Sequence, residues 1–205
     1  MPARKCLYCA LAALVVLVPL AFIGQGGEVS KASPFGFMVE NAGIRLVVDT
    51  ETARTKNDKP FIPIVIFIGS RGAQSIRLTR AAFTLTDPSG KVSPMATIEQ
   101  IQDKKNYGFS EVANDYTFIH KTIEVGPNIA AFNGLRIQPG TCFFKNIAGK
   151  PSIIRDDLEL RPNGWTWALL YFANPAGKAK GNYKLTYTDP TTKGVVVVPF
   201  EVDWK

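Results

Sequence analysis

The chain has 205 residues, and its 24 Lys and Arg exceed its 17 Asp and Glu to give a formal net charge of +7. The basic residues are scattered, which argues against a nucleic-acid partner. One histidine and three cysteines exclude a blue-copper site and a structural zinc site, and we expect no cofactor and no metal.

The N-terminus has the pattern of a secretory signal. Arg4 and Lys5 precede an apolar run over residues 7–24, and Gly24-Gln25-Gly26 supplies small residues for a signal peptidase. We predict cleavage near Gly26 and a periplasmic or extracellular location. The alternative is an uncleaved anchor in the cytoplasmic membrane, because a run of roughly 18 residues is at the short edge of what spans a bilayer.

Cleavage after residue 26 would remove two basic residues and no acidic one, which leaves 22 minus 17, or +5. Cys142 would then be the one cysteine left, so the mature chain could form no internal disulfide. We expect Cys142 to be a small buried hydrophobe, and the alternative is a reactive thiol or a cross-link to a partner. We predict a flexible spacer over residues 27–40 and one domain over residues 41–205.

Short alternating or apolar segments bounded by turn residues predict strands. In chain order these segments are 44–50, 61–68, 76–79, 82–86, 116–125, 135–138, 141–145, 165–172, 183–188 and 195–204. Pro63 inside the second segment argues against a regular strand there, because proline has no backbone N–H to donate to a β-ladder. Residues 94–102 predict a short helix and residues 156–160 a helical turn.

The remaining segments are polar or rich in Gly and Pro and predict turns and loops. They are residues 51–59, 70–74, 87–90, 103–115, 146–163, 175–181 and 189–194. Many short strands with little helix predict an all-β fold, an antiparallel β-sandwich of about seven to nine strands with one long irregular excursion.

Two hairpin patterns carry a family resemblance. One is the run Phe83-Thr-Leu-Thr-Asp-Pro-Ser-Gly90, preceded by Ile76-Arg-Leu78, and the other is Gly181-Asn-Tyr-Lys-Leu-Thr-Tyr-Thr-Asp189, followed by 195–202. The chain thereby resembles bacterial exported immunoglobulin-like domains of unknown function. The resemblance implies an immunoglobulin-like fold and an envelope location, and it carries over no functional residue.

Catalytic signatures are weak. His120 would have to serve any Ser-His-Asp or Cys-His arrangement, and no G-x-S-x-G turn occurs to pair with it. We expect His120 on the polar face of a strand. Asp156, Asp157 and Glu159 cluster without the spacing of a calcium loop, which is typical of a solvated acidic turn.

The aromatic segment 165–172 is the candidate binding site. Trp165, Trp167 and Tyr171 share one face of the predicted strand, while the opposite face is also apolar. One of these faces therefore needs a cover. The excursion over residues 146–163 could supply it, or an exposed aromatic platform could bind a sugar or a protein.

Three functions remain open. The first is a non-catalytic envelope binding or accessory domain that docks a protein partner. The second is a carbohydrate-binding module, which requires Trp165 and Trp167 to be exposed and coplanar. The third is a carboxylate-dependent hydrolase, which requires two facing carboxylates in a cleft with a raised pKa. We favour the first function and expect no enzyme activity.

Overall fold

A computed structural model describes residues 27–56, 59–102, 107–123, 127–138, 143–144, 156–174 and 181–203. The predicted signal at residues 1–26, Cys142, Trp204 and most of the predicted strand at 141–145 lie outside these ranges.

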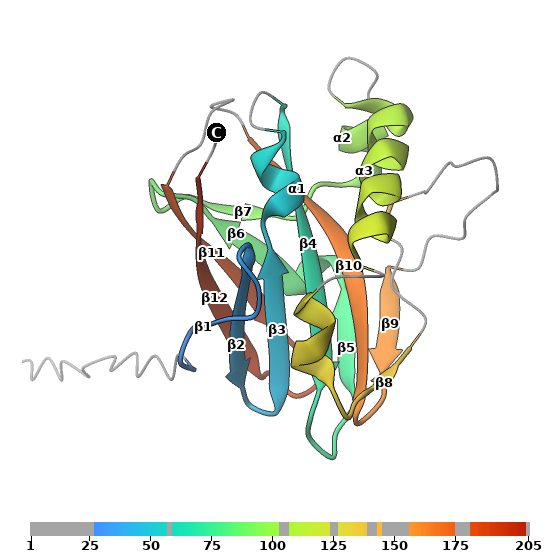
Figure 1. Ribbon diagram of the computed structural model, residues 1–205. Coiled ribbons are helices and arrows are strands. Elements are labelled where there is room, and N and C mark those ends of the chain that lie inside the picture. The colour runs from blue at the N-terminus through green and yellow to red at the C-terminus, as the bar shows by residue number, and fades with distance from the viewer. Residues whose placement is uncertain are drawn as a thin grey trace, which may run out of the picture.

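Two sheets pack face to face as a sandwich (Figure 1). The first sheet has the order β1-β2-β3-β4-β10-β8, and its strands are Ser30–Lys31, Gly36–Asn41, Ile44–Asp49, Phe61–Ser70, Gly164–Ala173 and Arg136–Ile137. The second sheet has the order β12-β11-β6-β7, and its strands are Val195–Val202, Gly181–Thr188, Phe83–Thr86 and Val92–Pro94. A small third sheet pairs β5 (Ile76–Thr79) with β9 (Asp157–Leu160).

The predicted β-sandwich is therefore confirmed at the level of its architecture. The described part of the chain forms twelve strands in three sheets, more than the predicted seven to nine. The ladders are antiparallel except that β8 runs parallel to β10. This exception arises because β8 comes to the edge of the first sheet from helix η2 (Pro127–Phe132) and not from a hairpin.

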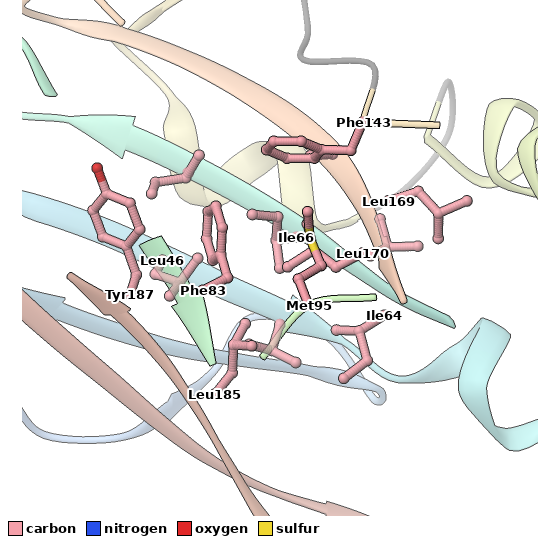
Figure 2. Packing of buried hydrophobic residues seen from close by; sticks show 14 of the residues in the cluster. Leu46, Ile64, Ile66, Phe83, Met95, Phe143, Leu169, Leu170, Leu185 and Tyr187 are labelled. Carbon is pink, nitrogen blue, oxygen red and sulfur yellow. The ribbon is translucent and has the colours of Figure 1, made fainter. Parts of the chain in front are cut away.

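The core lies between the two sheets (Figure 2). Leu46 of β3 and Ile64 and Ile66 of β4 face Phe83 of β6 and Leu185 of β11, and all five side chains are buried. Burial of each such side chain stabilises the fold by about 1.5–3 kcal/mol. The alternation of the strands in the sequence therefore reflects one face turned towards this core.

Pro63 lies inside central strand β4 without removing a ladder bond. It is paired with Tyr171 of β10, whose carbonyl accepts a hydrogen bond from the backbone N–H of Ala96 instead. The backbone of Pro63 therefore points to the opposite side, where pairing with β3 has already ended at Val65. The missing backbone N–H of Pro63 therefore leaves no ladder hydrogen bond of β4 unmade.

The predicted helix at residues 94–102 is confirmed as α2 (Ile98–Gln102). Its start has a reciprocal cap, because the backbone N–H of Thr97 donates to Gln100 Oε1 and the N–H of Gln100 donates to Thr97 Oγ1. The predicted loop at residues 51–59 contains a short helix, α1 (Glu51–Arg54). A 3-10 turn, η1 (Arg80–Ala82), joins β5 to β6.

The predicted strand at residues 116–125 is wrong, because residues 116–123 belong to helix α3 (Gly108–Ile123) and the last two residues lie outside the described ranges. His120 accordingly lies on a helix. Ile119 and Ile123 have the same parity along a strand, but a spacing of four residues also places them on one helical face. Val112, Tyr116 and Ile119 are the buried residues that follow this helical spacing.

Two further predictions are corrected. The expected spacer at residues 27–40 contains β1 and most of β2, because the turn at Ala42 and Gly43, with φ of 51° and 72°, folds β2 back against β3. The expected helical turn at residues 156–160 is strand β9, because Leu158 and Leu160 alternate with acidic residues and pair with β5.

Candidate functional site

Strand β10 places the three predicted site residues on the outer face of the first sheet, where the chain itself covers them. Trp165 is only 5% exposed, Tyr171 is fully buried and Trp167 is half-buried. The side chains therefore do not form the exposed, coplanar pair of tryptophans that a carbohydrate platform requires.

Among the described residues, η2 and α3 supply cover for the tryptophans, and most of the excursion at residues 146–163, which could also have supplied it, lies outside the described ranges. The Trp165 ring stacks on Phe132 of η2, with 5.3 Å between ring centroids. Trp167 contacts Tyr116 of α3, with 6.1 Å between centroids. An aromatic strand that is apolar on both faces is thus buried between the core and these helices.

A buried carboxylate fastens α3 over this face. Asp115 Oδ2 accepts hydrogen bonds from the hydroxyls of Tyr107 at 2.5 Å and Tyr171 at 2.8 Å. Lys56 Nζ lies 3.3 Å from Asp115 Oδ1 and 2.8 Å from Glu111 Oε2. The sequence places Asp115 in a loop, so its role could not be predicted without the helix.

These contacts change the titration of the neighbouring groups. Burial, followed by the charge of Asp115, raises the pKa of Tyr107 and of Tyr171. Burial acts to lower the pKa of Lys56, but its hydrogen bond to Glu111 and the charge of Asp115 outweigh burial and raise it. Both phenols therefore stay protonated donors and Lys56 stays charged, which suits a structural lock.

An accessible hollow lies at the end of the sandwich where three connections meet. These are the β2–β3 turn at residues 42–43, the β4–β5 loop at residues 71–75 and the β11–β12 turn at residues 189–194, together called the loop end. The turns after β2 and β4 are at the lower end of the view in Figure 1. Between the three connections is a hollow of about 420 Å³, lined by Ala42, Gly43, Ser70, Gly72, Ala73, Gln74, Ile76, Thr192 and Gly194.

Hydrogen bonds tie the three connections to one another. The backbone N–H of Arg71 donates to the Gly43 carbonyl at 2.8 Å. Asn41 Nδ2 donates to the Val195 carbonyl at 2.8 Å, and Ser70 Oγ closes its own loop onto the Gln74 carbonyl at 2.7 Å. The rim of the hollow is therefore held in place before any ligand arrives.

Asp189 lies in the third connection, the β11–β12 turn, and its side chain accepts hydrogen bonds that hold this turn. Its Oδ1 accepts the backbone N–H of Arg77 at 2.8 Å, and its Oδ2 accepts the N–H and hydroxyl of Thr192 at 2.8 Å and 2.5 Å. Burial acts to raise the pKa of Asp189, but these hydrogen bonds outweigh burial and hold the pKa below its usual value. Asp189 is consequently ionised and engaged at neutral pH.

A second hollow of about 520 Å³ adjoins the first at Ile76. Arg77 and Asp157 on its wall form a two-point ion pair with contacts of 2.7 Å and 2.5 Å. The Arg77 guanidinium lowers the pKa of Asp157. Arg71 at the loop end is likewise 3.5 Å from Glu40, so the charges around both hollows are largely matched.

Within the described residues, the carboxylates whose pKa is raised are Asp49 and Glu51. Burial raises the pKa of Asp49, and burial together with the charge of Asp49 raises the pKa of Glu51. Both oxygens of Asp49 are occupied, one by the backbone N–H of Glu51 and the other by Asn128 Nδ2. No cluster of three His, Cys, Asp or Glu side chains suited to a metal ion occurs in the described ranges.

None of the helices that the structure describes is long and apolar enough to cross a membrane. No protein-family model matches the chain, and no curated protein matches it. Among solved structures, the chain is similar to the yjhA protein from Bacillus subtilis, with 12% sequence identity and a TM-score of 0.41. The alignment covers 81% of this chain and 96% of that one. A likeness at this level carries no argument about this chain.

Proposed function

We propose that the chain is an exported, immunoglobulin-like domain of the cell envelope that binds a protein partner through its loop end and is not an enzyme. The observation that carries the proposal is the hollow between three connections that are hydrogen-bonded to one another.

Strand order supports the immunoglobulin-like assignment. β3, β4 and β10 are neighbours, as strands A, B and E are in an immunoglobulin domain. β12, β11, β6 and β7 correspond in order to strands G, F, C and C′. The β1–β2 extension and β8 would then be additions to one sheet, and the β5–β9 pair an insertion.

The same correspondence supports the choice of the loop end. The β4–β5 loop would open the B–C connection, and the β11–β12 turn would be the F–G connection. In antibody variable domains, connections of these two kinds lie at one end of the sandwich and contact the ligand. This step is an analogy between folds, so the direct support remains the hollow and its rigid rim.

Two observations favour binding over the alternative functions. The carboxylates of Asp49, Asp115 and Asp189 use their oxygens on groups of the chain itself, which suits structural roles and not general acid–base catalysis. The burial of Trp165 and Tyr171 removes the aromatic surface on which the carbohydrate alternative depended.

Filling the hollow tests the proposal. Ala73 is exposed and lines the hollow, so Ala73→Trp should block partner access without disturbing the core. Ala81→Trp is the matched control, because Ala81 is also exposed but lies in η1. We expect in-cell cross-linking of the wild type and of Ala81→Trp to yield the same adduct, and Ala73→Trp to lose it. Equal adduct yields from both variants would contradict the proposal.

A further inference from the structure

The outward side of the second sheet is a nearly uncharged surface, which we name the open face. It consists of the outward residues of β12, β11, β6 and β7. Its middle strands present Thr84, Thr86, Thr186 and Thr188. Val92 and Val195 on the open face are 59% and 41% exposed. A surface made largely of threonine and valine, on a chain with 20% charged residues, is a candidate for protein contact.

In the part of the chain that the structure describes, helices cover the opposite side of the sandwich and none packs over the open face. η2 and α3 pack over β4 and β10 of the first sheet, where Phe132 and Tyr116 contact the tryptophans. Figure 1 shows α3 on the side of β10, away from β11 and β12. Val92, Lys184, Thr188 and Val195 on the open face remain exposed.

The free edge of the second sheet is less suited to contact than its face. Pro199 lies midway along edge strand β12 and has no backbone N–H to donate. Near one end of β12, Asn41 Nδ2 donates a hydrogen bond to the Val195 carbonyl. Beyond the other end, Arg54 Nε donates a hydrogen bond to the Asp203 carbonyl. Addition of a strand along this edge would therefore have to break or forgo hydrogen bonds.

The charges of the open face are complementary to those of a second copy. Lys184 of β11 and Glu201 of β12 are its charged side chains, and both are exposed. Lys184 is paired with Pro199, so Glu201 lies two residues further along the neighbouring strand. Neither makes an ion pair within the described part of the chain. A two-fold axis in the plane of the face, midway between them, brings each opposite the other in the partner copy.

We propose that the open face is a homodimer interface, in which Lys184 meets the partner's Glu201 twice around a contact of threonine and valine. β11 and β12 have eight residues each, β6 has four and β7 has three. At about 3.4 Å per residue and about 4.8 Å between strands, the open face offers roughly 370 Å² per copy. A standard interface buries about 800 Å² per partner, so the dimer is weak and depends on concentration. The face has no net charge, which disfavours a highly charged partner such as a nucleic acid.

Sedimentation velocity of the full-length chain, in density-matched detergent if residues 7–24 are retained, tests this interface. We expect a monomer–dimer equilibrium in the micromolar to near-millimolar range. Lys184→Glu and Glu201→Lys, each alone, should raise the dimer dissociation constant by about tenfold or more, because like charges then meet twice. The double reversal should restore dimerisation to within about threefold of the wild type. Arg136→Glu, an exposed reversal on β8 of the other sheet, should have no effect.

Circular dichroism would show that each variant is folded, and Lys184→Gln with Glu201→Gln would replace any reversal that is not. A chain that stays monomeric at every concentration overturns the proposal and leaves the open face to a different protein. A dimer that is insensitive to both single reversals also overturns it, because the contact then lies on another surface.

Discussion

Each carboxylate oxygen of Asp189 accepts hydrogen bonds from a different part of the chain. Oδ1 accepts the Arg77 N–H and lies 3.3 Å from the Tyr187 hydroxyl, whereas Oδ2 accepts both donors of Thr192. Lys193 in the same turn has a φ of 62°, in the left-handed region that most residues avoid. The hydrogen bonds of Asp189 therefore help to hold Lys193 in this conformation within the turn.

Asp189→Asn should lower the free energy of unfolding by about 1–3 kcal/mol at pH 7, because one acceptor oxygen becomes a donor. The folded pKa lies below the ordinary value of 3.8, so the ionised form contributes its full stabilisation above that value. This contribution is lost as the pH falls through the lowered folded pKa. Urea unfolding at pH 7 and near pH 2 should show the difference between wild type and variant shrinking in acid.

Asp156→Asn is the control, because Asp156 is exposed and should change stability by less than about 0.5 kcal/mol. A gap between wild type and Asp189→Asn that stays constant across this pH range would refute the assigned role of the Asp189 charge.

Helix α3 depends on contacts with elements far along the chain. Its buried residues pack on β10, and Asp115 links it to Tyr171, 56 residues away, and to Lys56 after α1. Glu111, one turn earlier, also pairs with Lys56 but is partly exposed. The same helix thus carries a buried and an exposed member of one polar network.

Asp115→Ala should lower the free energy of unfolding by about 3 kcal/mol, because two buried tyrosine hydroxyls lose their acceptor and Lys56 loses a charge partner. Glu111→Ala removes only the exposed partner and should cost less than about 1 kcal/mol. Urea unfolding of both variants checks the comparison. Equal losses would mean that the Asp115 hydrogen bonds do not fasten the helix.

At the scale of elements, the alternation of apolar residues predicts most strands. It fails where the same residues also fit the spacing of a helix. Residues 183–188 and 195–202 alternate over eight positions or nearly so, and they form β11 and β12. Ile119 and Ile123 fit a strand and a helix equally well, so their segment was assigned to the wrong element. Leu158 and Leu160 are too few to distinguish a strand from a turn without their partners on β5.

The whole molecule combines an N-terminal apolar segment with a sandwich whose two outer faces differ. One face is covered by α3 and η2, and no described helix covers the other. An exported location would place the loop end and the open face outside the cytoplasm, where envelope partners are present. The proposed functions of both surfaces therefore need the N-terminal segment to direct export.

Intact-mass measurement of the chain purified from expressing cells should find a product that begins near residue 27, and not the 22.4 kDa precursor. Gly24→Trp should block processing, because a large side chain does not fit a position that signal peptidase reads. Gln25→Trp, between the two small residues, is the control and should be processed normally. Recovery of the precursor alone from wild-type cells would instead indicate a retained anchor.

By itself, the sequence determined the β-sandwich and a short helix within residues 94–102, because these patterns involve residues close along the chain. It also marked the turns at residues 70–74 and 189–194. Tertiary structure alone decided that these turns meet around a hollow, that Trp165 and Tyr171 are covered, and that Asp189 binds Arg77, 112 residues away. The physical reason is that such contacts depend on how sheets and helices pack, which leaves no periodic pattern in the local sequence.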